Sequence, residues 1–148
     1  MGQLTIRAAT AADFDAWLPL WRGYQAFYKV DLPEATTRTT WLRLLDPAEP
    51  MHLALAEHDG KVVGMVHFIE HRTCWNEANS IYLQDLFTLP GLRGKGIGRA
   101  LIEHVYAQAR AMGCAEVHWL THETNAEAMA LYDKLAERPG FVQYRKAI

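Results

Sequence analysis

The stretch from position 93 to position 99 holds the residues of this chain whose types and spacing best suit chemistry. It reads Arg93-Gly94-Lys95-Gly96-Ile97-Gly98-Arg99. Glycine lets the backbone curl until successive N–H groups point inward, and a helix that starts there adds partial positive charge. The arginines and the lysine add formal charge around the turn. The stretch therefore predicts an anion site, most simply one for a phosphate group.

The segments on either side of this turn predict how it is positioned. Residues 81–89 form an apolar, β-prone run directly before it. After it, apolar residues recur at helical spacing, namely Ile97, Leu101, Val105, Ala109 and Met112. Gly113 stands where glycine commonly ends a helix. We therefore expect a strand, a glycine-rich turn and a helix in that order, with the helix dipole behind the anion.

The rest of the chain predicts a mixed α/β fold. Apolar runs indicate strands at 4–7, 51–56, 61–70, 81–89, 116–120 and 141–144. Asp59-Gly60 is a hairpin turn signal between the second and third of these. The expected order is β-αα-β-β-β-α-β-α-β, and no repeat or linker indicates a second domain.

Two helices are expected before the hairpin and another towards the C-terminal end. Pro19 should kink or split the first helix, and Pro33 suits the start of the second. The late helix should begin near Asn125, where Thr124 and Glu127 have the spacing of a capping box.

Length, charge and cysteine content argue against several classes of protein. At 148 residues, half of them hydrophobic, the chain is expected to form one domain over residues 1–148. A net charge of −2 argues against a protein that coats nucleic acid. Cys74 and Cys114 are too few for a disulfide framework, and no signal peptide or membrane span is evident. We therefore expect a cytoplasmic protein whose partners include neither nucleic acid nor membrane.

Two common glycine motifs do not fit the turn. A P-loop needs Gly-Lys followed by Ser or Thr, whereas the Gly94-Lys95 pair is followed by Gly96. A dinucleotide fingerprint needs a glycine where this chain has Arg99 or Leu101. A third pattern, Arg/Gln-x-x-Gly-x-Gly/Ala, is matched in full by residues 93–98.

With this third pattern, and with Asn125 and Leu131-Tyr132 in the late helix, the chain resembles the GCN5-related N-acetyltransferase superfamily. Residues 82–87 and 140–146 look especially like its histone/polyamine and diamine branches. The resemblance implies a central, mostly antiparallel twisted sheet that is splayed after the fourth strand, with helices on both faces. It also implies that the glycine turn wraps the pyrophosphate of acetyl-CoA.

The resemblance further implies which residues serve the acetyl donor. The cofactor-binding set would be Leu86, Phe87, Thr88, Arg93, Gly94, Lys95, Gly96, Ile97, Gly98, Arg99, Asn125, Ala128 and Tyr132. A backbone N–H near Leu86 or Phe87, turned by a β-bulge, would stabilise the oxyanion. Asn125, Ala128 and Tyr132 share one helix face. Tyr132 would protonate the departing thiolate, and the alternative is a core tyrosine packed beneath the helix.

The general base is a point at which this chain departs from the family pattern. Diamine-type enzymes carry a Glu where this chain has Gln84, which cannot act as a base. Asp85 is the carboxylate that remains there, working directly or through water, although it could instead only hold the strand. Strand alternation sends Gln84 and Asp85 to opposite faces unless a bulge intervenes. Solvent, or His122 through water, is the other alternative.

Aromatic residues and histidines could line the acceptor side, because aromatic faces suit a cationic amine. The substrate candidates are Tyr24, Tyr28, Gln84 and Trp119, with Trp75, His67 and His71 as further residues that core or rim packing would also explain. The histidines show no metal-ligand spacing, so no metal is expected.

These residues together predict an N-acetyltransferase that moves the acetyl group of acetyl-CoA to a primary amine by direct attack in a ternary complex. The acceptor would be a polyamine, an amino acid, another small amine or a protein lysine. One alternative is a non-catalytic acyl-CoA-binding regulatory module, which Gln84 leaves open and Tyr132 argues against. Another is a nucleic-acid-binding protein that uses the basic patch at 93–99. A homodimer is usual in such families.

Overall fold

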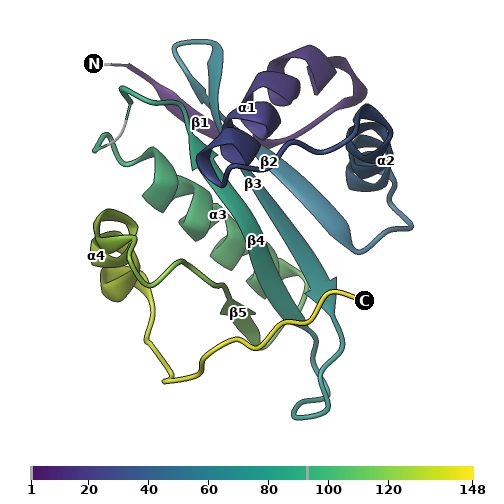
Figure 1. Ribbon diagram of the computed structural model, residues 1–148, viewed down its shortest axis with the longest axis vertical. Coiled ribbons are helices and arrows are strands. Elements are labelled where there is room, and N and C mark those ends of the chain that lie inside the picture. The colour runs from purple at the N-terminus through teal and green to yellow at the C-terminus, as the bar shows by residue number, and fades with distance from the viewer. Residues whose placement is uncertain (1, 93) are drawn as a thin grey trace.

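The computed structural model describes residues 2–92 and 94–148, so Arg93 of the expected phosphate turn lies outside the described residues. The elements appear in order in Figure 1. They are β1 (Leu4–Ala8), a 3-10 turn (Ala11–Asp13), α1 (Phe14–Phe27), α2 (Glu34–Leu45), β2 (Met51–His58), β3 (Lys61–His71), β4 (Ser80–Thr88), α3 (Ile97–Ala111), β5 (Glu116–His118) and α4 (Ala126–Leu135). No helix in this part of the chain is long and apolar enough to cross a membrane.

The strands form one mixed sheet in the order β1-β2-β3-β4-β5. The first three pairings are antiparallel, and β4 pairs with β5 in parallel. That last pairing joins only Ser80–Tyr82 to Glu116–His118. Beyond Tyr82 the sheet is therefore splayed, since β4 has no strand neighbour on its β5 side. The mixed sheet and its splay confirm the predicted fold class.

Apolar side chains pack on both faces of the sheet. On one face, α1 and α2 bury a cluster that includes Trp17, Leu20, Trp41, Leu55 and Met65. On the other, α3 buries a cluster that includes Val66, Ile81, Leu101, Ile102 and Val105. Fully burying a side chain of this size contributes about 1.5–3 kcal/mol. Helix α4 lies beside α3 on the splayed side (Figure 1).

A bulge in β4 reverses the faces that its side chains point to. Ile81 and Leu83 lie in the core under α3, and the next residue to pack there is Leu86. A regular strand would have placed residue 85 on that face. The extra residue is Gln84, because Leu83 pairs with Phe68 while Asp85 pairs with His67. The bulge therefore comes slightly earlier than the expected position near Leu86 or Phe87.

Local sequence signals and the structure differ in four places. Pro19 lies inside α1 without breaking it. The N-cap of α4 is Asn125, whose side chain accepts from the Ala128 N–H, whereas the Thr124 hydroxyl bonds to His122 Nδ1 at 2.7 Å. The strand expected at 141–144 does not form, since its residues have no strand neighbour. Predicted boundaries at β5 were also too long, because the strand ends at His118.

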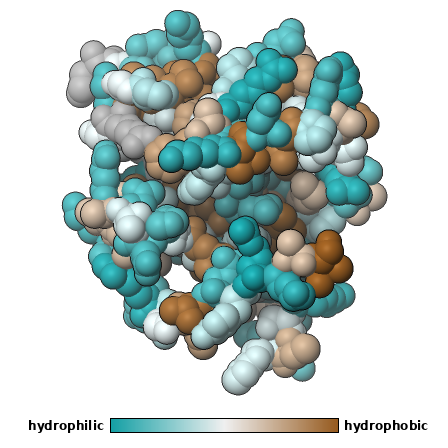
Figure 2. All heavy atoms as spheres, in the orientation of Figure 1, coloured by the Kyte–Doolittle hydropathy of each residue, from teal (hydrophilic) through white to brown (hydrophobic). Residues whose placement is uncertain are grey.

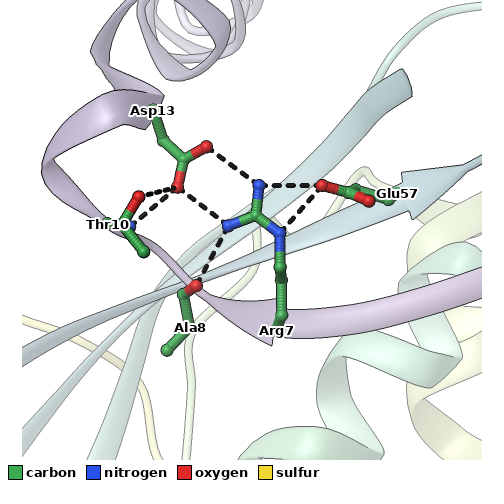
Figure 3. Close-up of polar contacts among 5 residues, drawn as sticks. All are labelled: Arg7, Ala8, Thr10, Asp13 and Glu57. Carbon is green, nitrogen blue, oxygen red and sulfur yellow. Dashed lines mark hydrogen bonds and ion pairs between the residues drawn. The ribbon is translucent and has the colours of Figure 1, made fainter. Parts of the chain in front are cut away.

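An arginine-centred cluster fixes the edge of the sheet to the start of the helical layer (Figure 3). The two Nη atoms of Arg7 each lie 2.8 Å from a carboxylate oxygen of Asp13. Arg7 Nε donates to Glu57 at 2.8 Å. The Asp13 carboxylate also accepts from the Thr10 N–H at 2.7 Å. Strand β1, the 3-10 turn and β2 are thereby joined through one guanidinium.

Candidate active site

A cavity of about 520 Å³ opens where the sheet is splayed. It lies between the end of β4, the glycine turn, α4 and the C-terminal end of α1. Its lining includes Tyr24, Tyr28, Leu86, Phe87, Thr88, Gly94, Gly96, Ile97, Gly98, Arg99, Asn125, Ala128 and Tyr132. The space-filling view in Figure 2 also shows the molecule hollowed between its α4 side and its main body. Residues from four separate segments, expected to share one site, thus surround one cavity.

Some of the expected site residues do not line this cavity. Lys95 is exposed on the turn. Gln84 is exposed, and Asp85 is buried behind the cavity wall. Trp119 lies behind Tyr132 and packs against it. In the described structure Trp119 makes a packing contact, and its substrate role stays a prediction.

The glycine turn has the backbone conformation that its sequence predicts. Gly94 and Gly96 adopt φ values of 78° and 79°, in the left-handed region that disfavours residues with a Cβ. Gly96 is the N-cap of α3 and no side chain caps the helix. The N–H groups of the first turn therefore lack helical partners and are free to bind an anion in the cavity.

Strand β4 contributes its free edge. Leu86, Phe87 and Thr88 line the cavity beyond the last residue that pairs with β5. On that side their backbone groups have no ladder partner. An extended ligand with amide groups could therefore pair with this edge as an added strand would.

Helix α4 forms the opposite wall with Asn125, Ala128 and Tyr132. The Asn125 side chain is engaged as the helix cap, with its Oδ1 3.3 Å from the Ala128 nitrogen. Tyr132 is half-buried, and burial, followed by the proximity of Tyr28, raises the pKa of its hydroxyl. The hydroxyl therefore remains a proton donor at neutral pH.

The C-terminal end of α1 closes the cavity with two tyrosines. The rings of Tyr24 and Tyr28 lie 4.9 Å apart, and Tyr24 meets Phe87 edge-on at 6.3 Å. Gly23 allows this approach, because a Cβ there would lie 2.9 Å from the Phe87 ring. Burial, followed by the negative charge of Asp85, raises the pKa of Tyr24 well above its ordinary value. Tyr24 thus stands between the cavity and Asp85.

Asp85 is held by a buried histidine that sequence reasoning had only placed among several acceptor-side candidates. Its Oδ2 lies 2.8 Å from Nδ1 of His67. The Nε2 of His67 accepts a hydrogen bond from the Trp17 indole at 3.0 Å. Only the bulge at Gln84 turns Asp85 towards His67, and sequence periodicity gives no signal for its position.

The other histidines considered for the site lie elsewhere. His71 Nε2 is 2.9 Å from His118 Nε2 at the far end of the sheet. His122 bonds to Thr124, and Trp75 is 94% exposed. Within residues 2–92 and 94–148, no group of three or more His, Cys, Asp or Glu side chains is placed to hold a metal.

A sheet splayed beside a glycine turn at a helix N-terminus defines the class of acyl-group transferases that the sequence resembles. The chain belongs to the Acetyltransferase (GNAT) family, whose model matches residues 16–136. It is similar to the D-amino-acid N-acetyltransferase HPA3 of Saccharomyces cerevisiae, with 35% identity over 97% of this chain and 91% of that protein. The chain is therefore an N-acetyltransferase.

Further similarities agree with this assignment. The L-ornithine N5-acetyltransferase NATA1 of Arabidopsis thaliana is 27% identical over 82% of this chain, which spans 49% of that protein. Among solved structures, the aminoglycoside N-acetyltransferase AAC(6')-Iy in complex with CoA superposes with a TM-score of 0.83. That match covers 100% of this chain and 97% of the other, at 20% identity, and so bears on the fold alone.

Proposed function

We propose that residues 1–148 form one domain that transfers the acetyl group of acetyl-CoA to a primary amine of a small molecule. The observation that carries this proposal is the single cavity shared by the glycine turn, the free edge of β4 and Tyr132. The similarity to enzymes named for D-amino acids and ornithine supports a small amino compound as acceptor.

The residues present fit acetyl-CoA as cosubstrate. The uncapped N-terminus of α3 and the left-handed turn at Gly94 and Gly96 suit a pyrophosphate. The basic residues of the turn, Arg93, Lys95 and Arg99, would add long-range attraction. The free edge of β4 at residues 86–88 suits the amide groups of a pantetheine arm.

In the proposed reaction the neutral amine nitrogen attacks the thioester carbonyl carbon, and the carbon–sulfur bond breaks. The N–H of Leu86 or Phe87 would stabilise the oxyanion. Tyr132 would give its proton to the departing thiolate. Asp85 would accept the amine proton, with the Tyr24 hydroxyl or water between them, since Asp85 does not itself line the cavity. Tyr24 and Tyr28, which line the cavity, would contact the acceptor.

The test is thiol release from acetyl-CoA over a panel of amines. The panel would include D- and L-amino acids, ornithine, polyamines, an aminoglycoside and a lysine peptide. We expect acceleration by at least one small amino compound, with an N-acetylated product of the matching mass. If acetyl-CoA binds tightly and no amine accelerates thiol release, the rival reading holds, namely a non-catalytic acyl-CoA-binding module.

We further propose a cytoplasmic homodimer. Support for the location comes from two free cysteines, Cys74 and Cys114. Support for the dimer comes from the exposed apolar side chains of Phe141, Val142 and Tyr144 in a segment that pairs with no strand. Light scattering coupled to size exclusion measures the mass, and a monomeric mass at micromolar concentration would rule the dimer out.

A further inference from the structure

Three side chains form a buried hydrogen-bonded chain between α1 and the sheet. Trp17, His67 and Asp85 are 0%, 3% and 9% exposed. The Trp17 indole nitrogen lies 3.0 Å from Nε2 of His67, and Nδ1 of His67 lies 2.8 Å from Oδ2 of Asp85. This series of hydrogen-bonded side chains runs from the core under α1 to β4, the strand that borders the cavity.

The chemistry of the indole fixes the direction of every bond in this chain. An indole N–H can only donate, so Nε2 of His67 must accept. In the neutral imidazole the proton then sits on Nδ1, which donates to the Asp85 carboxylate. A second proton on Nε2 would point directly at the Trp17 N–H and break that bond. The arrangement therefore favours a neutral His67 beside an ionised Asp85.

This series of hydrogen bonds also ends at Trp17, because the indole nitrogen cannot accept a proton. A proton taken up by Asp85 therefore has no exit through His67 and Trp17, and it must leave towards the cavity. The titratable groups on that side are Tyr24 and Tyr28 of α1. Tyr82 of β4 also lies within range of the Asp85 charge, since burial, followed by that charge, raises the pKa of Tyr82.

The bulge makes this geometry possible. With Gln84 as the extra residue, His67 and Asp85 become direct partners across β3 and β4. Without it, Asp85 would face α3 and lose both His67 and the tyrosines. A buried carboxylate is stable only when such partners satisfy it.

We propose that Trp17 and His67 are positioning residues that hold Asp85 ionised and in one orientation behind Tyr24. The inference rests on the proposed function, in which Asp85 accepts the amine proton. His67 acts through its Nδ1–H bond, and Trp17 acts through His67 by fixing the tautomer. Neither residue touches the substrate.

The first experiment measures kcat/KM against pH for the full chain with its best amine. In His67→Leu the hydrogen-bond donor to the Asp85 carboxylate is lost, and we expect the acid limb of the profile to move to higher pH. In His67→Gln an amide N–H can still donate, so the limb should return towards that of the wild type. A profile that keeps its shape in His67→Leu and only drops in height would overturn the proposal.

The second experiment separates the indole hydrogen bond from aromatic packing. Trp17→Phe keeps a ring but frees Nε2 of His67 to bind a second proton. A cationic His67 would stabilise the ionised Asp85, so the acid limb of kcat/KM should move to lower pH. Trp41→Phe is the matched control, because Trp41 packs 4.9 Å from Trp17 in the same cluster while the donor to His67 remains. We expect the control to leave the profile's shape unchanged. The same profile in both variants would contradict a role for the indole.

A third measurement does not depend on activity. Nitrogen-15 NMR of the histidine rings should show His67 protonated at Nδ1 and unprotonated at Nε2 in the wild type at neutral pH. The opposite tautomer, or an imidazolium, would overturn the inference. Failure of the proposed function would look different, since no amine would then be acetylated while the His67 tautomer remained as stated.

Discussion

The ring of Trp119 meets the ring of Tyr132 edge-on, with centroids 5.5 Å apart and planes inclined at 75°. This contact holds the tyrosine by its ring and leaves the hydroxyl free to reach the cavity. The orientation of the candidate acid thus depends on an aromatic contact behind the cavity wall. The hydroxyl can therefore be removed without disturbing that contact.

Tyr132→Phe should lower kcat by about 10²-fold, because a positioned general acid typically contributes that much or more. Affinity for acetyl-CoA should change little, since the ring and its packing on Trp119 remain. Single-turnover kinetics together with calorimetric binding measure the two quantities separately. Unchanged turnover in a folded variant would remove Tyr132 as the acid.

The pH dependence of kcat should show no loss from Tyr132 ionisation below about pH 10. The reason is that burial raises the pKa of Tyr132 above its ordinary value of 10.0, so the protonated donor persists to higher pH. The measurement is kcat at saturating amine from neutral pH upwards, with protein stability checked at each point. An alkaline decline centred well below pH 10 that disappears in Tyr132→Phe would contradict the assignment.

Gly96→Val should weaken acetyl-CoA binding by about tenfold. A side chain at φ 79° costs about 1–2 kcal/mol, and 1.4 kcal/mol corresponds to a factor of ten. A Cβ there meets no atom within 4 Å, so the effect comes from backbone strain and not from a clash. Calorimetry measures the dissociation constant.

The matched control for this substitution is Gly113→Val. Gly113 has a similar φ of 72° and equally open space, but it follows the other end of α3. It should reduce stability while leaving acetyl-CoA affinity unchanged. Equal loss of affinity in both variants would mean that the turn at Gly96 is not the phosphate site.

Asp13→Asn should destabilise the fold by about 1–3 kcal/mol at neutral pH, because it weakens the bidentate pair with the partly buried Arg7 (Figure 3). Arg7 and the Thr10 N–H lower the pKa of Asp13 below its ordinary value of 3.8. The contribution of the ionised Asp13 to the free energy of unfolding is therefore fully present above about pH 4 and is lost progressively as pH falls further. Urea unfolding between pH 7 and pH 2 should show a difference between wild type and variant that is constant above about pH 4 and shrinks progressively below it.

The exposed pair of Asp133 and Arg138 provides the comparison for that experiment. Its oxygen and nitrogen atoms are 2.6 Å apart, yet both side chains are largely open to water. Asp133→Asn should therefore change the free energy of unfolding little. A loss equal to that of Asp13→Asn would show that burial does not determine the strength of these pairs.

Parts of the fold and site could be predicted because they depend on local sequence. Helical spacing from Ile97 to Met112 and the glycines before it predicted α3 and its turn. The two-residue turn at Asp59-Gly60 forms with φ values of 54° and 79°, as its sequence predicts. These features follow from the backbone preferences of a few adjacent residues, so they need no tertiary information.

Other features depend on contacts that sequence periodicity does not report. Pro19 stays within α1, where flanking residues such as Trp17, Leu20 and Trp21 are buried against the sheet. Residues 141–144 have a strand-like pattern but pair with no strand in the described structure. The N-cap of α4 moved by one residue because the side chain of Thr124 bonds to His122 instead.

The sequence by itself determined the kind of anion site and the family, since both depend on residue types at fixed spacing within the chain. Only the tertiary structure decided which face of β4 carries Asp85 and what holds that carboxylate there. A single extra residue, Gln84, exchanges the two faces of β4, because side chains of a strand alternate with a period of two. That shift brings Asp85 to His67, a residue 18 positions away in sequence, and through it to Trp17.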